Sequence, residues 1–305
     1  MKNNLQHTCR ICEKIDLTES YYPEAHFNNK VFKYYKCNSC QSYNVFPSPN
    51  EDDFNKMYGE NDHTYLKEIS GKLEYNFNFP FADHQGYQIE FLKQIKDDIQ
   101  GKILLDYACG SGFYMHYAQK LGAKAVGVEF DEQFVNVLKS KTNLDIYTFQ
   151  NLHEQFKGKT FDYIHLGHVL EHLSAPLELI YQLKEFTHKD TLFIVDGPLE
   201  RNHCLHRFYV DFGSRLKGKK YRNSIPQHLT LTTQKSQLTF FKQAGLKKDK
   251  YIVTEQYFPL PFKLEKSIGK IVSYLIATAS ILLSKAIPSS GNIFHYRGKI
   301  DLKNK

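Results

Sequence analysis

The middle of the chain alternates between two hydrophobic periods. Short apolar runs predict buried strands at 102–107, 123–130, 143–149, 161–168 and 191–198. Between them, apolar residues recur at helical spacing and predict helices at 113–122, 131–141 and about 175–187. Strands that alternate with helices form a parallel sheet covered on both faces. We therefore expect an α/β fold with a doubly wound, mostly parallel sheet, which two later strands extend to seven.

The pattern changes on both sides of this region. A segment rich in His, Arg and Lys follows, and after it come a capped helix that starts at 232 and ends at Gly245 and strands at 248–258 and 292–300. Upstream, Asn50 is a plausible N-cap, and apolar residues from Ile89 to Ile99 mark one face of a helix. The expected units are a small module at 1–50, a helical connector or lid at 51–100, and a main domain at 101–305 with a basic loop inserted at 197–230.

One uncharged apolar stretch, residues 271–283, is a candidate for a membrane-spanning helix. Residues 271–283 carry no charge, but Lys270 and Lys285 flank them. The stretch is shorter than the roughly 20 residues that a spanning helix needs. We expect a packed helix, with peripheral contact to a membrane surface through 268–286 as the alternative.

Composition and charge indicate a globular protein with a weak preference for anionic partners. The apolar fraction of 41% and the charged fraction of 24% are typical of a globular protein of 305 residues. A net charge of +7 weakly favours anionic partners. The first ten residues contain no apolar core typical of an export signal, so a cytoplasmic location is expected.

A turn of small residues, ACGSG at 108–112, follows the first predicted strand of the sheet. Ligands of doubly wound sheets bind beyond the carboxyl ends of such strands. A phosphate loop is excluded because Phe113 follows the last glycine. A dinucleotide site is disfavoured because Met115 occupies the third glycine position. S-adenosylmethionine fits better, since Glu129 ends the next strand and its carboxylate can accept two hydrogen bonds from a ribose diol.

Three stretches resemble a known family. LLDYACGSGFYMHYAQKLGAKAVGVEFDEQFVNVLK, FDYIHLGHVLEHLSAPLELIYQLKEF and IPQHLTLTTQKSQLTFFKQAGL are similar to class I S-adenosylmethionine-dependent methyltransferases of the ubiquinone-methyltransferase-like branch. The resemblance covers most of 101–246 and implies that S-adenosylmethionine is the cofactor. It implies that the methionine part lies among Asp106, Ala108, Gly110 and Gly112, the ribose on Glu129, and the adenine against Phe130 and, more weakly, Asn151. The family usually has glycine where Ala108 stands, and alanine is strained there if φ is positive.

Two C-x2-C pairs stand near the start of the chain. Cys9, Cys12, Cys37 and Cys40 supply four thiolates suited to tetrahedral zinc, although the 24 residues between the pairs are slightly more than usual. A redox role fits poorly because no strand–helix context surrounds the pairs. Four cysteine ligands predict a structural zinc site, and the segment resembles a zinc module found on some sugar methyltransferases. Cys109 and Cys204 are expected to be core or loop residues.

Three histidines are candidates for the acceptor side. His168 and His172 follow the fourth strand, and His228 precedes a capped helix. Histidine is the usual general base near neutral pH. A structural cap or loop hydrogen bond is the favoured interpretation for each histidine taken singly, and we expect at least one of the three to contact the acceptor. From Arg201 to Arg222 the chain has seven Lys or Arg residues and one acid, Asp211, which suits a phosphate-bearing acceptor.

Three functions therefore compete. The first is a methyltransferase acting on a saccharide or a nucleotide- or lipid-linked sugar of surface-glycan biosynthesis. The second is an RNA methyltransferase, which is disfavoured because the basic residues gather in one loop instead of along the zinc module. The third is a non-catalytic binding protein that has kept the fold.

Overall fold

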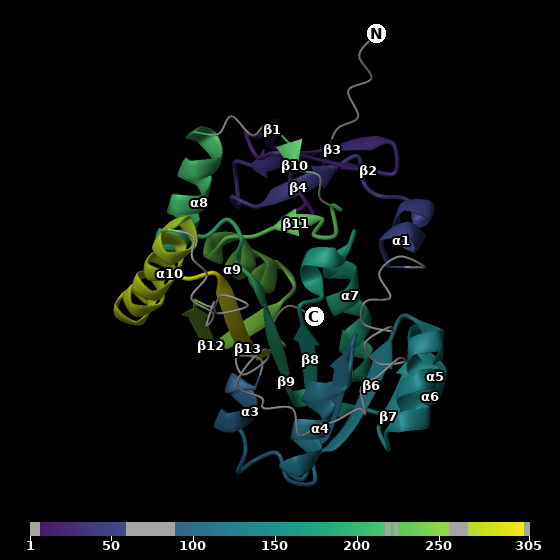
Figure 1. Cartoon of the computed structure of the whole chain (residues 1–305). Helices are drawn as coiled ribbons and strands as arrows, with labels where there is room; N and C mark the ends of the chain where they lie inside the picture. Colours follow the sequence, from purple (N-terminus) through teal and green to yellow (C-terminus); the bar gives the residue numbers. More distant parts are fainter. Residues whose placement is uncertain (1–6, 59–88, 217–220, 223–224, 256–267, 302–305) are drawn as a thin grey trace.

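The computed structural model describes residues 7–58, 89–216, 221–222, 225–255 and 268–301. A seven-stranded sheet lies at the centre of the main domain, in the order β12-β13-β9-β8-β5-β6-β7 (Figure 1). The pairs from β9 to β7 are parallel, and β13 is antiparallel to both of its neighbours. This confirms the predicted mostly parallel sheet. Its strands are β5 (Ile103–Tyr107), β6 (Lys124–Glu129), β7 (Asp145–Thr148), β8 (Phe161–Gly167), β9 (Thr187–Pro198), β12 (Leu246–Thr254) and β13 (Ile293–Ile300).

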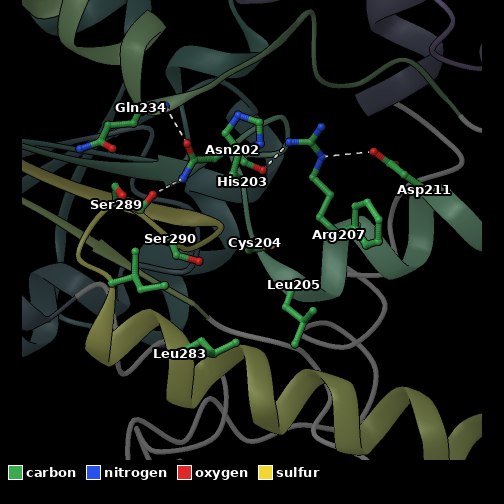
Figure 2. A pocket seen from close by; sticks show the side chains of 12 residues that line it. Asn202, His203, Cys204, Leu205, Arg207, Asp211, Gln234, Leu283, Ser289 and Ser290 are labelled. Carbon is green, nitrogen blue, oxygen red and sulfur yellow. Dashed lines mark hydrogen bonds and ion pairs between the residues drawn. The ribbon is translucent and has the colours of Figure 1, made fainter.

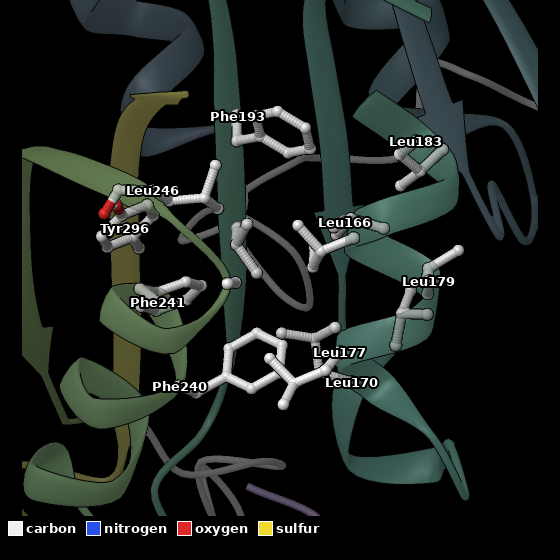
Figure 3. Packing of buried hydrophobic residues seen from close by; sticks show 14 of the residues in the cluster. Leu166, Leu170, Leu177, Leu179, Leu183, Phe193, Phe240, Phe241, Leu246 and Tyr296 are labelled. Atoms are coloured by element: carbon white, nitrogen blue, oxygen red, sulfur yellow. Dashed lines mark hydrogen bonds between the residues drawn. The ribbon is translucent and has the colours of Figure 1, made fainter. Parts of the chain in front are cut away.

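Helices cover both faces of the sheet because successive strand residues point to opposite sides. In β5, Leu104 packs into one core cluster and Leu105 into the other. The first cluster contains residues of α3 (Glu90–Gln94), α4 (Phe113–Lys120) and α5 (Glu132–Lys141). The second contains residues of α6 (Leu152–Phe156), α7 (Pro176–Leu183) and α9 (Gln234–Gln243). In the second cluster, Phe240 of α9 faces Leu177 of α7 (Figure 3).

The amino-terminal segment forms a second sheet, although its sequence shows little regular pattern. Its own strands are β1 (Leu17–Glu19), β2 (Glu24–Phe27), β3 (Lys30–Cys37) and β4 (Tyr43–Phe46). Two short strands from the basic insertion complete it: β10 (Tyr221–Arg222) pairs with β2, and β11 (Thr230–Leu231) pairs with β4. Its cysteines join the same core cluster as α7 and α9, so this module packs directly on the main domain.

The remaining helices differ in part from the sequence pattern. Helix α1 (Glu51–Tyr58) begins as predicted, with Asn50 Oδ1 accepting from the Asp53 amide at 2.9 Å. The apolar face predicted from Ile89 to Ile99 is helical only in α3. The segment expected as a basic loop contains α8 (Leu205–Leu216), and the apolar stretch forms α10 (Ile268–Ala286). Within the described ranges, no helix is long and apolar enough to cross a bilayer.

Candidate active site

The turn after β5 needs a left-handed backbone at three positions. Ala108, Gly110 and Gly112 have φ of 58°, 50° and 73°. A Cβ on Gly112 would lie 2.3 Å from Leu144 Cδ1, whereas a Cβ on Gly110 would meet no atom within 4 Å. The turn therefore packs tightly at Gly112 and leaves open space beside Gly110, where a ligand can approach the backbone. The φ of Ala108 is positive, so alanine is strained at this position, as expected from the sequence for a positive φ.

Close packing of α4 on the sheet uses a glycine of β6. A Cβ on Gly127 would lie 2.4 Å from Met115 Sδ and 2.7 Å from Cys109 Sγ. Met115 therefore fills the space that the third glycine of a dinucleotide fingerprint would keep free. Cys109 is buried beneath the turn, in agreement with its prediction as a core residue.

Glu129, at the end of β6, reaches the turn. Its Oε2 accepts a hydrogen bond from the Gly110 amide at 2.8 Å, and its Oε1 accepts one from the Phe130 amide at 2.7 Å. Burial raises the pKa of Glu129 more than these two hydrogen bonds lower it. The Phe130 side chain is 63% exposed, and Asn151 lies in a 3-10 turn after β7. The structure thus brings Gly110, Glu129 and Phe130 together.

Asp106 makes a contact that sequence reasoning missed. Its Oδ1 lies 2.7 Å from His165 Nδ1, and His165 Nε2 lies 2.9 Å from Asp196 Oδ2. All three side chains are buried, and the Tyr114 ring stacks on the imidazole with centroids 3.4 Å apart. Burial disfavours the imidazolium, but the two carboxylates outweigh it and raise the pKa of His165 to about 9. Asp106 is therefore engaged by a buried cation.

A second cluster follows β8. The His168 backbone has φ of 55°, and its Nδ1 lies 3.4 Å from Glu171 Oε1 and its Nε2 3.9 Å from Asp196 Oδ1. His172 Nε2 lies 4.0 Å from the same Glu171 oxygen. Burial alone would raise the pKa of Glu171, but His168, His172 and His228 outweigh it and lower this pKa to about 2. Glu171 is thus a buried carboxylate kept ionised by histidines.

His228 joins this cluster from the basic insertion. Its ring meets that of His172 edge to face, with centroids 4.6 Å apart, and its Nδ1 is paired with Glu200 Oε1. Burial lowers the pKa of His228, but Glu200 dominates and raises it to about 9. The three predicted histidines are therefore brought together around Glu171, and Glu200 is a fifth member that the sequence did not reveal.

The same cluster has a donor set suited to a divalent cation. One ligand atom each of Glu171, His172 and His228 lies within 4.8 Å of the others. His172 Nδ1 is 3.1 Å from the Gln227 carbonyl oxygen, and His228 Nδ1 is held by Glu200. Metal-bound histidines have their second nitrogen held in this way. The arrangement can hold a cation or bind an acceptor oxygen directly.

The two cysteine pairs meet in the amino-terminal module. Cys9 Sγ lies 3.6 Å from Cys40 Sγ, and Cys12 Sγ lies 3.6 Å from Cys37 Sγ. All four are buried, and their sulfur atoms lie within 4.8 Å of one another. Tetrahedral zinc with bonds of about 2.3 Å requires sulfur separations of about 3.8 Å. The four thiols therefore fit structural zinc, with no ligand position left for catalysis.

Comparison with known proteins identifies the main domain. The family described as "Methyltransferase domain" matches residues 83–251, more than half of the chain. A ribosomal protein methyltransferase of Thermotoga maritima is 31% identical over 107 residues, 33% of this chain and 39% of the relative. A mitochondrial ubiquinone biosynthesis O-methyltransferase of Schizosaccharomyces pombe is 26% identical over 108 residues, 32% of this chain and 39% of the relative. The matches thus span about two fifths of these relatives.

A solved structure is similar over a longer part of the chain. The crystal structure of a SAM dependent methyltransferase from Archaeoglobus fulgidus has 14% sequence identity and a TM-score of 0.46, with 78% of this chain and 99% of that one covered.

Proposed function

Because the chain belongs to the methyltransferase domain family, we propose that it transfers a methyl group from S-adenosylmethionine to a small anionic acceptor, a saccharide carried on a nucleotide or a lipid. The observation that carries the proposal is the contact between Glu129 and the Gly110 amide at 2.8 Å. It joins the acidic end of β6 to the open part of the turn after β5, and these are the two features that an adenosyl ligand requires.

The turn and β6 would bind the donor. The backbone around Ala108, Gly110 and Gly112 has the open side beside Gly110 for the methionine part. Glu129 would exchange its two amide donors for the ribose hydroxyls. Phe130 would cover the adenine, and Asn151 is a weaker candidate for the adenine edge. Asp106 supports this region through His165 and is a positioning residue in this proposal.

The histidine cluster would serve the acceptor. When bound, S-adenosylmethionine supplies an electrophilic methyl group on a sulfonium. In an in-line displacement, the bond from this methyl to sulfur breaks as its bond to the acceptor forms, and the sulfur keeps the electron pair. A neutral histidine then takes the acceptor proton. His168, His172 and His228 are the candidates. Burial lowers the pKa of His172, so this histidine is already neutral near pH 7, whereas His228, with a pKa of about 9, would accept a proton only at higher pH. Holding both reactants in line can contribute about 7–11 kcal/mol.

The names of the two relatives refer to a ribosomal protein and to ubiquinone biosynthesis, so they indicate no saccharide acceptor. Two features of this chain do. Seven Lys or Arg residues between Arg201 and Arg222 favour an acceptor with a phosphate. The resemblance of the zinc module to that of some sugar methyltransferases favours a saccharide.

Calorimetry with S-adenosylhomocysteine tests donor binding. The full chain is expected to bind one equivalent. Glu129→Ala should weaken binding by roughly tenfold or more because a charge-assisted hydrogen bond is lost. The exposed Glu132 lies three residues away, and Glu132→Ala should leave binding unchanged. Absence of binding by the unaltered chain would overturn the proposal.

The acceptor needs a separate assay. Turnover of S-adenosylmethionine with a panel of nucleotide-sugars should be lost in His228→Asn and retained in His153→Asn, since His153 is exposed and outside the cluster. Turnover with RNA, and with none of the sugars, would replace the saccharide by RNA.

A further inference from the structure

Helix α10 has most of its described large apolar side chains on the outside. Leu275 and Leu282 are 59% and 61% exposed, and Ile271 and Leu283 are also exposed. A helix on the surface of a globular domain normally turns its apolar stripe inward. The reversed arrangement of α10 therefore calls for an apolar environment around its outer face.

The inner face of α10 carries small and polar residues. Ala277, Ser280 and Ser284 are buried at helical spacing. Ser280 Oγ donates to Glu255 Oε1 at 2.5 Å and accepts from the His206 amide of α8 at 3.1 Å. These two hydrogen bonds fix the rotation of α10 about its axis, so the helix cannot turn to bury Leu275 and Leu282.

Helix α8 extends the apolar surface. Phe208 is 71% exposed, and Phe212 stacks beside it at 6.4 Å between ring centroids. In Figure 1 both helices project from the same side of the molecule. We call the outward side chains Phe208, Phe212, Ile271, Leu275, Leu282 and Leu283 the apolar face.

A cavity of about 510 Å³ opens between the two helices. Leu205 and Phe208 of α8 and Leu283 of α10 line it, while Asn202 and Arg207 form its polar side (Figure 2). Two of these lining residues, Phe208 and Leu283, also belong to the apolar face. A chain-like apolar group that reaches the face therefore has a hollow to enter.

The charges around the face suit an anionic surface. Helix α10 contains no Asp or Glu, and its two lysines, Lys270 and Lys285, stand near its ends. The one acid of α8, Asp211, is paired with Arg207 at 3.4 Å. Helices that lie in a membrane interface combine exposed Leu and Phe with basic residues in this way. Long lysine side chains can keep their charge at the headgroups.

From this combination we propose that the apolar face docks on the surface of a lipid bilayer with anionic headgroups. The two helices would lie along the interface and not cross it. Docking would place the enzyme at the membrane surface. If the acceptor of the proposed function is lipid-linked, docking would also bring the protein to it. Vesicle binding is measured without methyl transfer, so its failure is separate from a failure of donor binding.

A fluorescent reporter provides a direct test, because the chain contains no tryptophan. Leu275→Trp should shift its emission to the blue with vesicles of phosphatidylcholine and phosphatidylglycerol, because the indole enters an apolar layer. Ile15→Trp replaces a residue of similar exposure, 57%, in the amino-terminal module and should show no shift. Equal shifts at both positions, or no shift at Leu275→Trp, would overturn the proposal.

Co-sedimentation of the unaltered full chain gives an independent measure. Leu275→Ser with Leu282→Ser should reduce partition into the same vesicles by roughly tenfold or more. Ile15→Ser with Val31→Ser, at similarly exposed sites, should leave partition unchanged. The opposing outcome is that the chain fails to bind vesicles and forms a dimer that Leu275→Ser with Leu282→Ser abolishes. In that case a second copy of the chain covers the apolar face, and the proposal of lipid docking is wrong.

Discussion

The backbone amide of Leu229 donates a hydrogen bond of 2.7 Å to the carbonyl oxygen of Glu171. On its other side, the Leu229 carbonyl oxygen accepts from the Val45 amide of β4 at 2.9 Å and from Arg10, which lies between two metal-ligand cysteines, at 3.4 Å. One residue therefore connects the cysteine module to the histidine cluster, and His228 is its neighbour in the chain. The module is in a position to hold His228 in place.

Loss of zinc should therefore loosen the histidine cluster without removing donor binding. In Cys37→Ser, we expect the Leu229 amide to exchange its hydrogen faster, because β4 no longer holds β11. S-adenosylhomocysteine affinity should change little, since Gly110 lies in the turn after β5 and Glu129 at the end of β6, both outside the cysteine module. Hydrogen exchange by mass spectrometry and calorimetry provide the two readouts.

Cys204→Ser is the matched control, because Cys204 lies outside the cysteine cluster. Both readouts should match those of the unaltered chain. If Cys37→Ser leaves Leu229 exchange unchanged, the module does not hold this segment.

Much of the main domain could be predicted because its signals are local. The strand at 103–107 and the small residues after it are adjacent in the chain, so periodicity and the turn residues were sufficient. Glu129 could be placed by the same rule, since parallel strands end at one edge of the sheet. The four cysteines were recognised from their spacing alone.

Contacts between distant segments could not be predicted in this way. His165 lies inside an apolar strand and looks like a core residue until β5 and β9 are placed on either side of it. Glu200 meets His228 only because the insertion folds back on the amino-terminal module. Strands β10 and β11 have two residues each, too few to show a period. These features depend on pairing across the chain.

Replacing Ala108 by glycine should stabilise the protein. Alanine with φ of 58° is strained, whereas glycine adopts this conformation freely. Because glycine also has more freedom in the unfolded chain, we expect a net gain of up to about 1 kcal/mol in the free energy of unfolding, measured with urea. Ala279→Gly, inside α10, should instead lose about 0.5–1 kcal/mol. A loss at Ala108→Gly would mean that the turn is not strained.

His165→Ala should be strongly destabilising. It leaves Asp106 and Asp196 buried without their shared cation, and breaking a buried ion pair on one side costs about 3–5 kcal/mol. His188 lies 3.5 Å from Asp162 at a half-buried, solvent-accessible site, and His188→Ala should cost about 1 kcal/mol or less. Urea unfolding compares the two variants at neutral pH.

The difference between the unaltered chain and His165→Ala should depend on pH. The pKa of His165 is raised from 6.5 to about 9, so the stability it contributes is fully present below about 6.5 and is lost as pH rises through 9. The difference in unfolding free energy between the unaltered chain and His165→Ala should therefore become smaller as pH rises from about 6.5 to 9. A gap that stays constant would mean that His165 is neutral between the two carboxylates.

Glu200 should control the protonation of His228. The pKa of His228 is raised to about 9 by Glu200, against the opposing effect of burial. Glu200→Gln removes the charge, so burial should dominate and the His228 ring should titrate well below 9, which histidine NMR can follow in the full chain. The exposed Glu185 pairs with His153 instead, and Glu185→Gln should leave the His228 titration unchanged.

The lower pKa of His228 in Glu200→Gln should also appear in turnover. Any proton transfer to His228 would occur closer to neutral pH, so turnover of the variant should reach its plateau at lower pH. If the His228 ring still titrates near 9 in Glu200→Gln, Glu200 is not the group that raises its pKa. Glu171 is then the first candidate, and the histidines around it share protons as one coupled group.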